Sequence, residues 1–121
     1  MADIFDEFRN LIKKLNQGKI NYAVCGGWAM AIHGLPRATA DIDLLILSEN
    51  LSEAWKIAED LNYNVEGLPL SFDNGIVEIR RISKIDKESK TLFTIDFLLF
   101  TEGLRKVWET RENIDFEDDR V

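Results

Sequence analysis

The sequence predicts a single α/β (α+β) domain in which helices flank a mixed sheet. Segments with helical spacing of apolar residues alternate with short runs of β-forming residues, in the order helix, strand, helix, strand, helix, strand, strand. The chain has 121 residues, of which 45% are hydrophobic, and this is enough for one core. We therefore expect one domain over residues 1–121.

The first half of the chain predicts three helices and two strands. The predicted segments are a helix over 4–15 that ends near Gly18, a strand over 20–25, a helix over 28–33, a strand over 41–47 and a helix over 51–61. A loop rich in Gly, Pro and Arg is expected over 34–40. The strand over 41–47 is almost continuously apolar after Asp43, which predicts a central strand buried on both faces.

The second half predicts two strands and a short helix. The predicted segments are a turn near 71–74, a strand over 75–82, a polar connection over 83–90, a strand over 91–100 and a helix over 104–108. The strand over 91–100 carries one charge, Asp96, among apolar residues. The acidic tail over 110–121 is expected to be loosely held.

The net charge and the distribution of basic residues limit the classes of binding partner. A net charge of −7 disfavours nucleic acid as a partner through bulk electrostatics. Positive charge is nevertheless concentrated in one run: Arg80, Arg81, Lys84, Lys87 and Lys90. This run predicts either a solvated hairpin or a rim that faces a polyanion or an acidic partner.

The cysteine and histidine content limits disulfides and metals. The lone Cys25 excludes an internal disulfide and suits a reducing cytoplasm, and the acidic N-terminus does not resemble a signal peptide. One His and one Cys cannot build a structural zinc site. A metal would therefore be held by oxygen ligands, which favours Mg²⁺ or Mn²⁺.

Asp41 and Asp43 are the first candidate site. They are two residues apart in a strand, so their side chains point to the same face while Ile42 points into the core. At about 4 Å and an effective dielectric of about 20, two carboxylates repel by roughly 4 kcal/mol. Such a pair persists if it is solvated at a strand start, if one carboxylate is protonated, or if a divalent cation lies between them.

Asp96 and a diglycine extend this candidate site. A buried unpaired carboxylate costs several kcal/mol, so Asp96 is either satisfied by an arginine or by backbone N–H groups, or it joins Asp41 and Asp43 around a metal. The second arrangement requires the two strands to be neighbours. Gly26 and Gly27 precede a predicted helix, where they form either a simple turn or a phosphate-binding backbone.

These residues resemble a known signature. Gly26-Gly27, thirteen intervening residues and Asp41-Ile42-Asp43 resemble the signature of the DNA polymerase β-type nucleotidyltransferase superfamily. The fuller string GGWAMAIHGLPRATADIDLLI is similar to a minimal bacterial branch that contains abortive-infection and toxin–antitoxin nucleotidyltransferases. Many members of the superfamily have Gly-Ser where this chain has two glycines.

The resemblance implies an activity and a set of roles. The activity is the Mg²⁺- or Mn²⁺-dependent transfer of a nucleoside monophosphate from an NTP, such as ATP, to a hydroxyl of a protein, a tRNA or a small molecule. Asp41, Asp43 and Asp96 would bind metal, and Asp96 would also act as the base. Gly26 and Gly27 would hold the triphosphate, with Arg37 and Thr39 as further nucleotide-binding residues.

The resemblance also implies an alternative function. A minimal nucleotidyltransferase of this kind can serve as the antitoxin to a helical ribonuclease toxin, with or without catalysis. Larger members carry a second helical region after the third carboxylate. The resemblance leaves three alternatives: this chain has lost that region, the chain was cut before it, or a partner or a second copy supplies it. A toxin partner or a homo-oligomer is therefore expected beside the NTP substrate.

Overall fold

The computed structural model describes residues 4–25, 41–72, 77–87, 90–109, 115–116 and 119–120. Its elements in chain order are α1 (Ile4–Gln17), β1 (Tyr22–Cys25), β2 (Asp41–Ile46), the 3-10 helix η1 (Ser48–Asn50), α3 (Leu51–Asp60), β3 (Val65–Glu66), β4 (Leu70–Phe72), β5 (Val77–Asp86), β6 (Thr91–Leu99), the 3-10 helix η3 (Glu102–Leu104), α4 (Arg105–Glu109), β7 (Asp115–Phe116) and β8 (Asp119–Arg120). No helix among these residues is long and apolar enough to cross a membrane.

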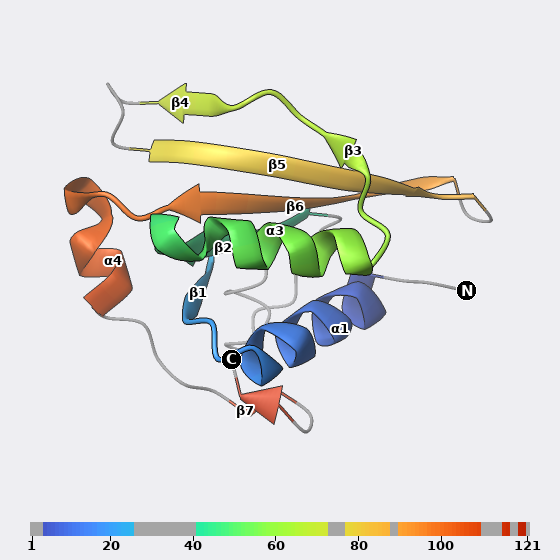
Figure 1. The fold of residues 1–121 in the computed structure, drawn as a ribbon, viewed down its shortest axis with the longest axis horizontal. Coiled ribbons are helices and arrows are strands. Elements are labelled where there is room, and N and C mark those ends of the chain that lie inside the picture. The colour runs from blue at the N-terminus through green and yellow to red at the C-terminus, as the bar shows by residue number, and fades with distance from the viewer. Residues whose placement is uncertain are drawn as a thin grey trace.

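One six-stranded mixed sheet organises the fold (Figure 1). Its order is β1-β2-β6-β5-β3, and β4 also pairs with β5. β2 and β6 are parallel, whereas β1 pairs with β2, and β5 with β6, in antiparallel fashion. This arrangement confirms the predicted α+β class and makes β2 and β6 neighbours within the sheet.

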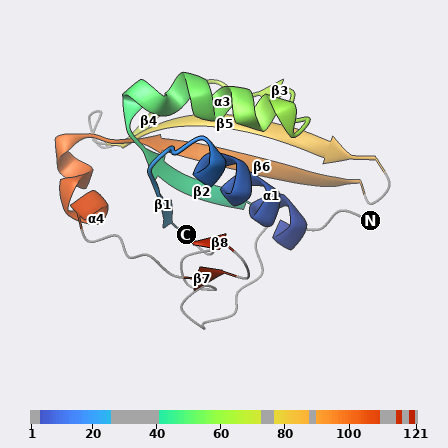
Figure 2. The same ribbon diagram turned by 60° about the horizontal axis from the view of Figure 1, so that its bottom comes forward.

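The two long helices, α1 and α3, cover one face of the sheet (Figures 1 and 2). α1 presents Phe8, Leu11, Ile12 and Leu15, at helical spacing and without exposed area, to the strands. α3 contributes the small residues Ala54 and Ala58, which the core also buries fully. Small side chains let this helix approach the sheet closely.

The strands supply the other half of this core through alternate residues. From β2 and β6 the buried core residues are Ile42, Leu44, Ile46, Phe93, Ile95, Phe97 and Leu99. Because side chains alternate along a strand, the residues between them face the opposite side of the sheet. That opposite face carries the acidic residues.

Most predicted elements agree with the structure, but the polar connection predicted over 83–90 is wrong. β5 continues to Asp86 and forms a long hairpin with β6. Ser83 and Lys84 interrupt the apolar pattern because each is inside the fold with a polar partner: the Ser83 hydroxyl lies 2.9 Å from that of Thr94. The helix predicted over 28–33 and the loop over 34–40 lie outside the described residues.

The tail that was expected to be loosely held includes two short strands. β7 and β8 pair with each other in antiparallel fashion. β8 lies beside α1.

A buried polar cluster joins α1, β5 and the segment after α3. The Glu7 carboxylate accepts a hydrogen bond from the Tyr63 hydroxyl at 2.9 Å and forms an ion pair with Lys84 at 2.7 Å. Lys84 Nζ also donates to the Leu61 carbonyl and lies 4.8 Å from the centroid of the Tyr63 ring. Burial, and then the charge of Glu7, raises the pKa of Tyr63, so the phenol stays a donor.

We expect the Lys84→Met substitution to destabilise the protein by roughly 3 kcal/mol, because it leaves the buried Glu7 carboxylate without its cation. The measurement is urea unfolding at pH 7.5. Lys87→Met is the matched control, since Lys87 is exposed near the end of the same strand, and we expect it to change stability by less than about 0.5 kcal/mol. Equal effects of the two substitutions would show that the Glu7 cluster does not stabilise the fold.

Candidate functional site

Three carboxylates lie on the face of the sheet opposite the long helices. Asp43 on β2 is the register partner of Asp96 on β6, and Asp41 is two residues before Asp43 on the same face. The predicted metal site required the strand of Asp41 and Asp43 to lie beside the strand of Asp96. The parallel pairing of β2 with β6 meets this requirement. The residues therefore share one patch in the middle of the sheet.

Burial differs among the three. Asp41 is exposed at the start of β2, Asp43 is half-buried and Asp96 is buried. A carboxylate as deep as Asp96 requires hydrogen-bonding or charged partners. The site thus runs from solvent at Asp41 into the sheet at Asp96.

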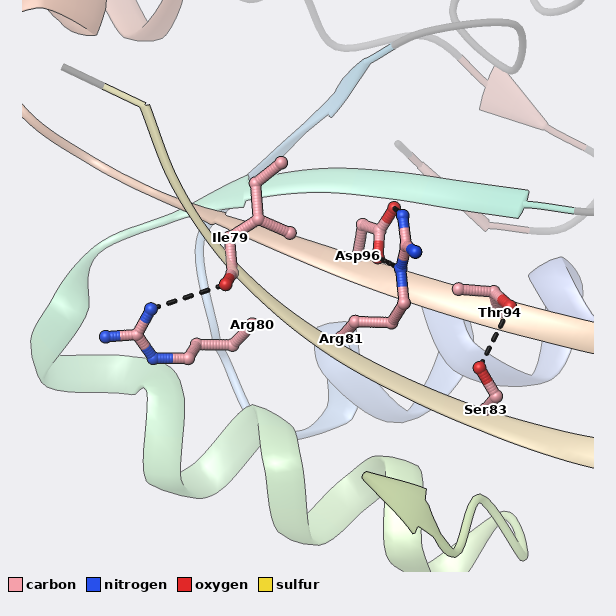
Figure 3. A network of polar contacts seen from close by, with 6 residues as sticks. All are labelled: Ile79, Arg80, Arg81, Ser83, Thr94 and Asp96. Carbon is pink, nitrogen blue, oxygen red and sulfur yellow. Dashed lines mark hydrogen bonds and ion pairs between the residues drawn. The ribbon is translucent and has the colours of Figure 1, made fainter. Parts of the chain in front are cut away.

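Arg81 of β5 is the partner of Asp96 (Figure 3). Its Nε donates to Oδ1 at 2.7 Å and its Nη2 donates to Oδ2 at 3.0 Å, so that the pair is bidentate. The two residues are also register partners on the antiparallel strands. The sequence left open whether an arginine satisfies Asp96, and in this structure Arg81 does.

Sequence reasoning missed Arg81 as a site residue. The hairpin pairs Asp86 with Thr91, and counting back along both strands brings Arg81 opposite Asp96. The predicted polar connection over 83–90 concealed this register. A hairpin centred near residues 88 and 89 would have revealed it.

The basic run does not form a single surface. Arg81 faces Asp96, whereas Lys84 points to the helix side, where it pairs with Glu7. Arg80 points away from Arg81, with its Nη1 donating to the Ile79 carbonyl at 3.3 Å (Figure 3). Alternation along β5 thus divides this charge between the two faces of the sheet.

Burial and the neighbouring carboxylates perturb the pKa of the middle carboxylate, Asp43. Burial, followed by the charges of Asp96 and Asp41, raises the pKa of Asp43 from 3.8 to about 6, against the opposing effect of Arg81. A hydrogen bond with Asp96 contributes to the increase. The site therefore carries more negative charge than one arginine neutralises, which is the electrostatic condition for binding a cation.

Cys25 ends β1 directly opposite Asp43. Burial, and then the charge of Asp43, raises the pKa of its thiol. The thiol donates weakly to the Ala23 carbonyl at 3.6 Å. A thiol held in the protonated form is a poor nucleophile.

The donor set fits a hard divalent cation. Asp41, Asp43 and Asp96 offer only oxygen, which suits Mg²⁺ or Mn²⁺. As the side chains stand, no group of three or more His, Cys, Asp or Glu within the described part of the chain has a metal-binding arrangement. Both oxygens of Asp96 are bonded to Arg81 instead.

The other predicted site residues lie outside the described residues. These are the glycines Gly26 and Gly27, together with Arg37 and Thr39. Their expected roles in nucleotide binding stay predictions. Among the described residues, β1 ends at Cys25, the register partner of Asp43, and β2 begins at Asp41.

Comparison with solved structures finds the same fold elsewhere. A crystal structure of a Thermotoga maritima protein, provisionally described as a nucleotidyltransferase, matches 97% of this chain and 74% of its own, with a TM-score of 0.67 and 15% sequence identity. This chain has a nucleotidyltransferase-like fold. Neither a scan against models of known protein families nor a search among curated proteins finds a match.

We expect the Asp43→Asn substitution to stabilise the protein, and to do so more at pH 7.5 than at pH 4.5. The folded-state pKa of Asp43 is about 6, above the ordinary 3.8, so its contribution to stability is present below about pH 4 and is lost as the pH rises through 6. The full interaction is worth up to about 3 kcal/mol, and solvent screening of a half-buried group reduces this to about 1 kcal/mol. Urea unfolding at both pH values measures the difference.

Asp60→Asn is the control for this prediction. Asp60 is exposed at the end of α3, so the substitution makes the same change in charge away from the acidic patch. A stabilisation by Asp43→Asn that did not depend on pH, or that Asp60→Asn reproduced, would contradict the assigned repulsion.

Proposed function

We propose that this chain is a metal-dependent nucleotidyltransferase that transfers a nucleoside monophosphate from an NTP to a hydroxyl acceptor. One observation carries the proposal: Asp43 and Asp96 are register partners on parallel central strands, with Asp41 on the same face. Three carboxylates in such a patch suit divalent metal ions and phosphoryl-type chemistry. The nucleotidyltransferase-like fold supports the same conclusion.

Each carboxylate has a role in this proposal. Asp41, Asp43 and Asp96 would hold the divalent ion, which when bound would neutralise the triphosphate, align it and lower the pKa of the acceptor hydroxyl. Asp96 accepts the proton of that hydroxyl through a carboxylate oxygen. The acceptor oxygen forms a bond to the α-phosphorus while the bond to pyrophosphate breaks.

The triphosphate would lie against Gly26 and Gly27, with Arg37 and Thr39 as additional contacts. These roles rest on the sequence resemblance. A backbone without side chains allows N–H groups to approach phosphate oxygens closely, and a helix that follows directs its positive end toward them.

The charge of the protein bears on the acceptor. A net charge of −7 favours a protein side chain or a small molecule over a long nucleic acid. The basic run does not offset this preference, since Arg81 and Lys84 are each paired with a carboxylate. The alternative, an antitoxin without catalysis, needs neither the metal nor the nucleotide.

Titration calorimetry with ATP, GTP, CTP and UTP, in Mg²⁺ and in EDTA, tests the proposal. We expect one or more NTPs to bind in Mg²⁺ only, and Asp43→Asn to lose that binding. In a transfer assay with radiolabelled NTP, we expect Asp43→Asn to lower turnover by about 10³-fold or more, judged from losses at comparable electrostatic positions.

Asp60→Asn is again the control and should retain wild-type binding and turnover. Turnover by Asp43→Asn at the wild-type rate would disprove the assignment. If no NTP binds to wild-type protein in Mg²⁺, the antitoxin alternative gains over the enzyme.

A further inference from the structure

The ion pair between Arg81 and Asp96 joins two side chains with very different exposure. The side chain of Arg81 is 44% exposed and that of Asp96 is 8% exposed. Both oxygens of the buried carboxylate accept from one guanidinium (Figure 3). Asp96 is therefore fixed in the sheet, whereas its cation is held from the solvent side.

Gly67 makes room for the base of the arginine side chain. The Gly67 N–H donates to the Arg81 carbonyl at 2.9 Å, at the edge of the sheet beside β5. A Cβ at Gly67 would lie 3.2 Å from Arg81 Cβ and 3.4 Å from Arg81 Cγ. The lack of a side chain at Gly67 thus lets the aliphatic part of Arg81 lie close to the backbone.

The field of the whole acidic patch acts on Arg81. The hydrogen bonds that Arg81 donates to Asp96, together with the charge of Asp96, raise the pKa of Arg81, and the charges of Asp41 and Asp43 add to the effect. Arg81 is thus a permanent single positive charge facing three carboxylates. The divalent ion of the proposed function would require the same carboxylates and carry twice the charge.

We propose that Arg81 is a built-in counter-cation that binds Asp96 in the absence of metal and is displaced from it when a divalent ion binds. This inference rests on the proposed function. Asp96 does not stay buried without a cation, because an unpaired carboxylate is strongly unfavourable in a buried position. Arg81 can leave at low cost, since its half-exposed guanidinium regains water. Metal and arginine therefore compete for one carboxylate.

A titration with Mn²⁺ alone tests whether Arg81 and the metal compete for Asp96. The concentration of free Mn²⁺ is measured by electron paramagnetic resonance. We expect Arg81→Gln to bind Mn²⁺ roughly tenfold more tightly than wild type, because a positive charge a few ångströms from the ion is removed. Arg80→Gln is the matched control. It removes the same charge from the neighbouring residue, whose side chain points to the other side of β5, and should change affinity less than twofold in 0.15 M salt.

A second variant tests the same competition if Arg81→Gln does not fold. Arg81→Lys keeps the positive charge but cannot make the two-point contact with Asp96, so we expect an intermediate increase in Mn²⁺ affinity, roughly threefold. Thermal unfolding gives an independent readout. Saturating Mn²⁺ should raise the Tm of both Arg81 variants more than that of wild type.

The outcomes separate this inference from the proposed function. Tighter Mn²⁺ binding by the Arg81 variants than by Arg80→Gln supports competition. Equal or weaker binding by the Arg81 variants would overturn it and leave the metal site of the proposed function in place. Absence of Mn²⁺ binding in wild type and in every variant would overturn both.

Discussion

The parallel pairing of β2 with β6 determines both how the core is packed and where the acidic residues lie. On the helix side, the same register that brings Asp43 beside Asp96 pairs Ile42 with Ile95 and Leu44 with Phe97. A shift by one residue would turn Asp96 into the apolar core and expose its neighbours. The hydrophobic core therefore sets the alignment of the acidic patch, although no core residue belongs to it.

β5 supplies the cations that make this arrangement tolerable. Arg81 neutralises Asp96 on one face of the sheet, and Lys84 neutralises Glu7 on the other. Ser83 lies between them in the sequence, and its hydroxyl forms a buried hydrogen-bonded pair with that of Thr94. One strand with alternating polar residues thus satisfies buried groups on both sides, which explains how a hairpin with so many charges can lie inside a sheet.

The sequence predicted the parts of the fold that depend on apolar periodicity. The first helix, the central strand and the strand containing Asp96 are where the spacing of Leu, Ile and Phe places them. The length of β5 was not predictable in the same way. The buried Ser83 and the partly buried Lys84 each have a polar partner within the fold, and in the sequence they resemble a loop. Local patterns do not reveal a partner that is distant in the chain, such as Glu7 for Lys84.

The acidic patch was only partly predictable for the same reason. Alternation along a strand places Asp41 and Asp43 on one face, but the sequence does not show which strand lies alongside. The arginine partner of Asp96 depends on the hairpin register, which the polar connection predicted over 83–90 concealed. Residues 26–40 lie outside the described part of the chain. The contacts with nucleotide that we propose for this segment rest on the sequence resemblance.

We propose that the three carboxylates on β2 and β6 form one divalent-cation site. The most direct measurement is anomalous diffraction from crystals of the full chain grown with Mn²⁺ and an NTP. We expect an ion with oxygen ligands from Asp41, Asp43 and Asp96 at about 2.1 Å, and we expect Arg81 to be no longer bonded to Asp96. A saturated crystal with no ion among the three carboxylates, and the Arg81–Asp96 pair intact, would contradict it.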